Sequence, residues 1–154
     1  MQDLSLKADE RYMQMALEEA TAAYKEGEIP VGAVIVGRDG RVLARDHNRT
    51  ERLTDVTAHA EMLALTSAFN NLGGKYLPGC TIYVTVEPCT MCAGALGWSQ
   101  IGRIVYGAPD VKRGFFSCMQ GAMSPIHPKT TVQSGVLEDE CRMLMIDFFK
   151  RLRR

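Results

Sequence analysis

Apolar residues recur at steps of three and four positions along several stretches of the chain, which is the spacing of an amphipathic helix. The first stretch contains Met13, Leu17 and Tyr24 and stops before Gly27, a residue type that commonly ends helices. The segment at 89–99 is rich in small residues, as is typical of a tightly packed helix. The pattern predicts four helices, at 9–25, 58–69, 89–99 and 137–153.

Short runs of β-branched and other apolar residues alternate with these helices and indicate strands. The Asp39-Gly40 step between the first two runs is a strong signal for a hairpin. Residues 107–129 show no clean period and are expected to be mostly loop, with room for one short helix. The predicted strands lie at 31–36, 41–44, 81–86, 101–106 and, with a much weaker pattern, 130–132.

A hairpin followed by alternating strands and helices is typical of an α/β fold. We therefore expect a three-layer α/β/α sandwich, with a central mixed sheet of about five strands and helices on both faces. The 154 residues, 46% of them apolar and 23% charged, suit a single globular domain over 1–154 and exclude a disordered or collagen-like chain.

Charge and cysteine content limit the possible binding partners and the cellular compartment of the protein. Eighteen basic and eighteen acidic side chains cancel, so any surface for nucleic acid must be local. Five unevenly spaced cysteines do not fit a secreted disulfide scaffold, and the chain starts without a charged-then-apolar leader. The apolar stretch around 31–36 is far too short for a bilayer span. We expect a soluble, cytoplasmic protein whose cysteines bind metal or take part in catalysis.

Metal-binding side chains gather in two short segments, TAHAE at 57–61 and EPCTMC at 87–92. A catalytic zinc ion usually takes three protein ligands and leaves its fourth position to water. His59, Cys89 and Cys92 supply three ligands whose charge balances the metal. A closed zinc site, a redox pair and two packed thiols are the alternatives. A closed site needs a fourth ligand, however, and a redox pair gives no role to the His-x-Glu.

The spacing within each segment predicts how the side chains converge. The two cysteines differ by three positions, so their sulfurs lie on one side of a helix start, where unpaired N–H groups and the helix dipole favour thiolates. The histidine and Glu61 differ by two, so they share a site only if it lies beyond the end of their helix. We predict that two helix N-termini, at 58–61 and 89–92, face one metal ion.

The predicted chemistry gives the glutamate a task. Zinc lowers the pKa of bound water to about 7, so hydroxide becomes available at neutral pH. Attack on an amidine-like ring carbon then needs a proton on the ring nitrogen and another on the departing amine. Glu61 can take the proton from water and pass it on. The alternative, a surface position for Glu61, leaves no obvious group to move these protons.

The His-x-Glu and Pro-Cys-x-x-Cys motifs are the signature of zinc-dependent nucleobase deaminases. Further matches resemble the bacterial tRNA adenosine deaminases, a family of the cytidine-deaminase-like superfamily, and cover most of the chain. Asn48, Gly107-Ala108 and Phe148-Phe149 narrow the resemblance to this family. The other matching stretches are PVGAV at 30–34, YVTVEPC at 83–89, MCAGA at 91–95, IGRIVYGA at 101–108 and GVL at 135–137.

The resemblance implies hydrolytic conversion of the wobble adenosine of a tRNA anticodon to inosine, by a homodimer with one zinc ion per subunit. It also implies that Asn48 hydrogen-bonds the target nucleotide, that Val31 packs against its base, and that the backbone around Ala60 and Pro88 reads the base edge. A loop base enters such a pocket at a low unstacking cost. The alternative for Asn48 is a turn position after a strand.

In an RNA enzyme of zero net charge, phosphate contacts must come from local patches. The basic run at the C-terminus is the best of these, although it also suits the dipole of a helix end. Asp110 and Lys112, in a predicted loop, are ordinary surface positions unless RNA is the substrate. The candidate RNA contacts are Asp110, Lys112, Lys150, Arg151, Arg153 and Arg154.

Residues 109–130 depart from the family, because GFFS stands at 114–117 where a run of small residues is usual. A second hypothesis is therefore a deaminase of a small free substrate, such as guanine, cytosine or a nucleoside, whose pocket Phe115 and Phe116 would close. A third is a non-catalytic, zinc-stabilised subunit that only binds RNA. Such subunits typically lack the glutamate. Trp98 is expected in the core or at a subunit interface.

Overall fold

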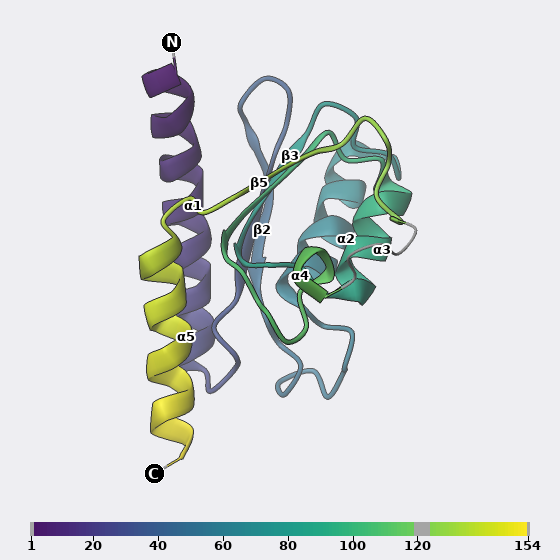
Figure 1. Ribbon diagram of the computed structural model, residues 1–154. Coiled ribbons are helices and arrows are strands. Elements are labelled where there is room, and N and C mark those ends of the chain that lie inside the picture. Colours follow the sequence, from purple (N-terminus) through teal and green to yellow (C-terminus); the bar gives the residue numbers. More distant parts are fainter. Residues whose placement is uncertain (1, 119–123, 154) are drawn as a thin grey trace.

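Residues 2–118 and 124–153, which the computed structural model describes, contain five strands in one mixed sheet (Figure 1). In chain order the strands are β1 (Gly32–Val36), β2 (Val42–His47), β3 (Thr81–Val86), β4 (Arg103–Ala108) and β5 (Thr131–Ser134). Across the sheet the order is β2-β1-β3-β4-β5. β1 is antiparallel to both β2 and β3, whereas β3, β4 and β5 are parallel.

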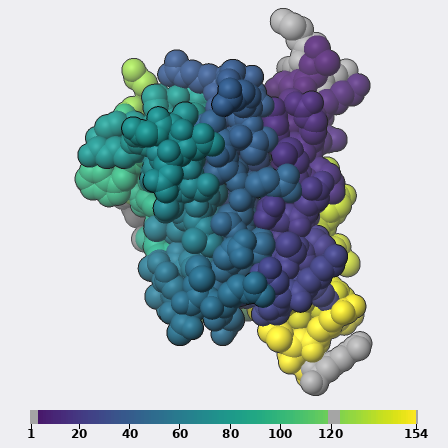
Figure 2. All heavy atoms as spheres, turned by 180° about the vertical axis from the view of Figure 1, so that it is seen from behind, coloured from purple at the N-terminus to yellow at the C-terminus, as the bar shows by residue number. Residues whose placement is uncertain are grey.

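Helices cover both faces of this sheet (Figure 1). α1 (Gln2–Lys25) and α5 (Glu138–Leu152) lie side by side on one face, while α2 (Ala60–Leu72), α3 (Thr90–Ser99) and the short α4 (Phe115–Cys118) lie on the other. Seen from behind, the purple α1 follows one edge of the molecule beside the yellow C-terminal residues (Figure 2). The predicted three-layer α/β/α sandwich with a mixed sheet is confirmed.

Two apolar clusters join the layers. One lies under α1 and α5 and includes Met13 and Val105, and the other lies under α2 and α3 and includes Ile82 and Leu96. The continuous apolar runs of the inner strands therefore have a helix layer to pack against on each side. None of the described helices combines the length and the apolar character that crossing a membrane requires.

The structure differs from the sequence-based expectations where burial gives no signal. α1 begins at residue 2, seven residues before the predicted start at position 9. The prediction missed its first turns because they have no stripe of buried apolar residues; Leu4 and Leu6 are 71% and 48% exposed. β5 forms although all four of its residues are exposed, since it is held by pairing with β4. Trp98 is 85% exposed, which excludes the core from its two predicted places.

Candidate metal centre and active site

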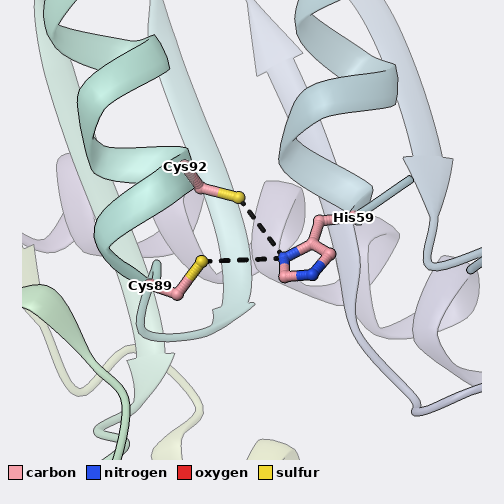
Figure 3. Close-up of side chains that lie close together, drawn as sticks. All are labelled: His59, Cys89 and Cys92. Carbon is pink, nitrogen blue, oxygen red and sulfur yellow. Dashed lines mark hydrogen bonds between the residues drawn. The ribbon is translucent and has the colours of Figure 1, made fainter. Parts of the chain in front are cut away.

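Two helix N-termini bring the predicted metal ligands together. His59 is the N-cap of α2 and Cys89 is the N-cap of α3, which follows directly on the end of β3. The His59 Nδ1 atom lies 3.7 Å from the Cys89 Sγ atom and 3.5 Å from the Cys92 Sγ atom (Figure 3). All three donor atoms lie within 4.8 Å of one another, as the ligands of one ion must.

The electrostatics of the cluster suit a divalent cation. A hydrogen bond from Cys92, together with one from His59, lowers the pKa of Cys89 to about 3, so this sulfur is a thiolate. The same pairing with Cys89 raises the pKa of Cys92 and of His59. One imidazole and two sulfurs form a ligand set that zinc prefers. The imidazole Nδ1 atom lies 3.5–3.7 Å from the two sulfurs.

Glu61 lies in the first turn of α2, two residues after His59, and only 4% of it is exposed. Burial raises the pKa of Glu61 to about 7, although the nearby positive charge of His59 opposes the shift. A carboxyl group with this pKa both accepts and donates a proton near neutral pH. The start of α2 therefore places a buried carboxyl group two residues from His59 and outside the group of three metal-binding side chains.

Residues 6–108 match the family described as the cytidine and deoxycytidylate deaminase zinc-binding region. This chain belongs to that deaminase family. The tRNA-specific adenosine deaminase of Agrobacterium fabrum is 44% identical over 149 residues, which cover 92% of this chain and 94% of that protein. The zinc cofactor and the hydrolytic deaminase class predicted from the sequence are confirmed.

Solved structures support the same placement. One from a study of A-to-I editing by tRNA:A34 deaminases at the wobble position of transfer RNA has a TM-score of 0.82 and 45% identity, covering 87% of this deaminase and 98% of that chain. The guanine deaminase from Nitrosomonas europaea has a TM-score of 0.76 and 27% identity, covering 90% of this deaminase and 83% of that chain. The fold and the resemblance to tRNA adenosine deaminases are confirmed.

Two of the residues expected to bind substrate lie side by side. The Asn48 N–H donates to the Val31 carbonyl at 3.1 Å, so the residue that follows β2 is joined to the one that precedes β1. Asn48 is buried, and Val31 packs at the edge of the α2-side cluster. The Arg49 N–H donates to the Ala58 carbonyl at 3.0 Å, which ties this pair to the approach to α2.

The other two expected substrate contacts flank the metal ligands. Ala60 is buried and is the first residue of α2, between His59 and Glu61. Its N–H belongs to the first helical turn, where backbone donors have no partner within the helix. Pro88 is buried directly before Cys89, and its carbonyl accepts a hydrogen bond from the Phe115 N–H at 2.9 Å. The Pro88 carbonyl thus already has a partner within the chain.

Glu87 is a buried side chain to which the sequence analysis gave no role. Its carboxylate accepts hydrogen bonds from the Ser117 hydroxyl at 2.6 Å, the Ser117 N–H at 2.7 Å and the Asp110 N–H at 2.9 Å. Gly114 lies so close that a Cβ atom there would be 2.2 Å from the Glu87 Cδ atom. Glu87 thus fastens residues 110–117 to the end of β3. A carboxylate directly after a buried strand was the available signal, since such a group needs donors.

The aromatic pair of the divergent segment points inward. Phe115 is buried, and Phe116 stacks on Tyr106 with ring centroids 5.9 Å apart and an interplanar angle of 7°. The two rings meet edge to face, 5.3 Å apart. Phe116 packs against the α2-side cluster, so at least part of the bulk of this pair is used in packing.

A cleft of about 460 Å³ opens beside His59. One wall is the loop between β2 and α2, which the buried Glu28 holds by accepting the Glu51 N–H at 3.0 Å and the Arg52 N–H at 2.7 Å. The lining is polar, as an approach to a nucleotide requires. Its residues are Thr50, Glu51, Thr54, Asp55, Val56, His59 and Arg113.

The loop candidates for RNA contact lie next to this cleft. The Asp110 carboxylate accepts the N–H groups of Lys112 and Arg113 at 3.1 and 3.0 Å, so it shapes the turn that carries them. Lys112 is exposed. Asp110 is therefore bound to its own turn, and the turn presents the cations Lys112 and Arg113 to solvent together with Val111.

The basic run lies at the end of α5, on the opposite face of the sheet from α2 and α3 (Figure 1). Lys150, Arg151 and Arg153 are exposed. Arg151 pairs with Asp147 at 3.4 Å and lies over the Tyr24 ring, 5.4 Å from its centroid. Part of the run thus joins α5 to α1. Arg154 lies outside the described residues.

Proposed function

We propose that this chain is a zinc-dependent hydrolase that converts adenosine to inosine at the wobble position of a tRNA anticodon and releases ammonia. The observation that carries the proposal is the convergence of one imidazole, two sulfurs and a buried carboxyl group at two facing helix N-termini. The 44% identity with a tRNA-specific adenosine deaminase supports the choice of substrate.

In this proposal His59, Cys89 and Cys92 hold the zinc ion. Zinc bound there would lower the pKa of a coordinated water to about 7. The two thiolates would balance its charge, and their positions at the start of α3 would let the helix dipole stabilise them. Before zinc binds, contacts of 3.7 and 3.5 Å between the His59 Nδ1 atom and the two sulfurs hold the three side chains together (Figure 3).

Glu61 moves the protons. It takes one from the attacking water and delivers it to the ring nitrogen of adenine, next to the carbon that is attacked. A second proton passes from the new hydroxyl group through Glu61 to the amine, which leaves as ammonia while the carbonyl of inosine forms. Burial keeps the pKa of Glu61 near 7, so both transfers are balanced at neutral pH.

The target nucleotide is held by residues around this centre. Asn48 hydrogen-bonds it and Val31 packs against the base, which is consistent with their being neighbours beside the approach to α2. The backbone at Ala60 and Pro88 contacts the base edge. Phosphate contacts come from the turn of Asp110 and Lys112 and from the basic run of α5. The tRNA substrate favours a cytoplasmic location.

We propose that the protein is a homodimer formed through α2 and α3. A groove of about 410 Å³ between these helices is lined by apolar groups that include Met62, Phe69 and Tyr76 as well as Trp98. Trp98 is 85% exposed and Tyr76 is 49% exposed. Exposed aromatic residues around an apolar groove are typical of interface anchors. Because the same helices hold the metal ligands, the dimer contact would lie close to the active site.

The experiment offers purified protein four substrates: unmodified anticodon stem-loop RNA, guanine, cytosine and cytidine. We expect inosine in the RNA and no ammonia from the other three. Ammonia from guanine or another free substrate, without inosine in the RNA, would replace this proposal with the free-base hypothesis, which the likeness to a guanine deaminase keeps relevant.

A further inference from the structure

The wall of the cleft opposite the loop between β2 and α2 carries one cation, Arg113. We propose that Arg113 binds a phosphate of the RNA strand next to the target nucleotide, and that Glu87 is the positioning residue that holds it there. The inference deepens the proposed function and depends on it, because it assigns a backbone contact to the same substrate.

The surroundings of Arg113 fit a phosphate. It lines the cleft with His59, so a strand that delivers a base to the metal centre passes its side chain. Among the described residues, its guanidinium makes no ion pair or hydrogen bond. The facing wall carries Glu51 and Asp55, whose carboxylates repel a phosphate. The Asp55 carboxylate already accepts the Thr57 hydroxyl at 2.7 Å. The strand's phosphate must therefore lie on the Arg113 side.

The backbone of Arg113 is held at two levels. Its own N–H donates to the Asp110 carboxylate at 3.0 Å. The Asp110 N–H and both donors of Ser117 are in turn bound to the buried Glu87 carboxylate. Gly114, the next residue, rests against that carboxylate, where any side chain would collide with it. A guanidinium carried on a fixed turn loses less freedom when it binds, so the positioning strengthens the contact.

The first test measures the Kd of fluorescently labelled anticodon stem-loop RNA as a function of salt, in the Glu61→Gln background so that the substrate is not consumed. We expect Arg113→Ala to weaken binding on the order of tenfold. The slope of log K against log salt should fall by about 0.7, as for the loss of one contact to a single-stranded phosphate. Arg113→Lys should keep the slope and lose part of the affinity.

The matched control is Arg41→Ala, which removes an exposed arginine from the β1–β2 turn. The Arg41 side chain is 76% exposed and pairs only loosely with Asp39, at 3.7 Å. It should leave both affinity and slope unchanged. An Arg113→Ala protein with the affinity and slope of its parent would overturn the proposal.

The role of Glu87 is tested by a double-mutant cycle. Glu87→Gln and the milder Ser117→Ala should each weaken RNA binding while zinc content stays at one ion per chain. In combination with Arg113→Ala neither should weaken it further, because both act through the same contact. Full additivity would show that Glu87 acts independently of Arg113 and would overturn this part.

If the unmodified protein deaminates no stem-loop RNA, the proposed function fails and this inference fails with it. If the unmodified protein is active and Arg113→Ala changes nothing, only this inference fails.

Discussion

At the scale of single residues, the centre combines one sulfur of lowered pKa with a carboxyl group of raised pKa. Hydrogen bonds from Cys92 and His59 lower the pKa of Cys89. Glu61 lies two residues after His59 in the first turn of α2, and burial raises its pKa because little water is left to stabilise its charge. The two shifts are opposite in sign within one cluster. They suit the roles that we propose, which are metal binding for the sulfur and proton transfer for the carboxyl group.

Replacing Glu61 with glutamine should separate these two roles. The amide keeps the shape but cannot carry a proton, so we expect deamination to fall by roughly 10² to 10⁴-fold. Zinc should stay stoichiometric in elemental analysis, because Glu61 is not a ligand. Glu10→Gln, which alters an exposed glutamate of α1, is the matched control and should keep full activity. Full activity of Glu61→Gln would remove Glu61 from the mechanism.

The metal ligands and Glu61 could be predicted from the sequence because their chemistry is tied to residue type and short spacing. Three metal ligands at these spacings, with a glutamate beside the histidine, admit few alternative explanations. Glu87 could not be assigned in the same way, because its partner Ser117 lies 30 residues away and is a residue type common on surfaces. The contact depends on where β3 and the segment after β4 meet, which only the fold determines.

At the scale of elements, the position of α1 on the sheet depends on Gly32. A Cβ atom at Gly32 would lie 2.0 Å from the Ala16 carbonyl oxygen and 2.6 Å from the Ala20 nitrogen. Both are backbone atoms, which cannot rotate away. The absence of a side chain at the start of β1 therefore sets how closely the helix approaches the sheet.

Gly32→Ala should consequently lower the free energy of unfolding by about 1–3 kcal/mol, because α1 must shift away from β1. Urea denaturation followed by circular dichroism measures this change. Gly74→Ala is the control, since a Cβ atom there has no neighbour within 4 Å and its φ is not positive. Equal stability of the two variants would mean that α1 accommodates the methyl group without cost.

The ion pair between Asp9 and Arg103 joins α1 to β4 and gives stability a defined dependence on pH. Burial by itself raises the pKa of Asp9, but hydrogen bonds from Arg103 and Tyr83 outweigh it and bring the pKa below 3.8. The folded protein thus holds this proton less tightly than the unfolded chain. The stabilisation is fully present above pH 3.8 and is lost as the pH falls below that value.

Asp9→Asn tests this linkage. At pH 7 we expect a loss of roughly 1–3 kcal/mol, because Arg103 loses a charged partner that is 2.7 Å away. The difference between the two proteins should shrink as the pH is lowered below 3.8. Unfolding free energies across pH 2–7 measure it. A difference that stays constant as the pH falls through 3.8 would show that folding does not lower the pKa of Asp9.

The elements themselves were predicted in proportion to their burial. β3 and α2 have continuous or periodic apolar positions because each packs on the core, and the sequence shows them clearly. β5 shows almost no pattern because its four residues are all exposed and backbone pairing alone holds it. The early start of α1 lacks a pattern for the same reason. Hydrophobic periodicity reports burial, so it does not predict helices and strands whose residues are exposed.

At the scale of the whole molecule, the exposed aromatic residues beside α2 and α3 suggest how copies assemble. Tyr24 and Phe148 pack edge to face between α1 and α5, with centroids 5.6 Å apart, although Met143 and Leu152 of α5 remain 59% and 64% exposed. The layer of α2 and α3 leaves Trp98 and Tyr76 at an open apolar groove. An indole with 85% of its surface exposed is costly to hydrate, and a second copy of the chain would cover it.

Trp98→Glu should therefore convert the proposed homodimer into a monomer of 17.0 kDa, because a charge placed at the centre of an apolar contact cannot be desolvated cheaply. Sedimentation equilibrium measures the mass, and zinc content shows whether the active site survives. Leu4→Glu introduces the same charge at an exposed apolar position of α1, on the other face of the sheet, and should stay dimeric. A monomeric parent protein, or a Trp98→Glu protein that remains a dimer, would place the interface elsewhere. Because α2 and α3 carry the metal ligands at their N-termini, a monomer that keeps its zinc but loses affinity for stem-loop RNA would further show that the second subunit completes the RNA surface.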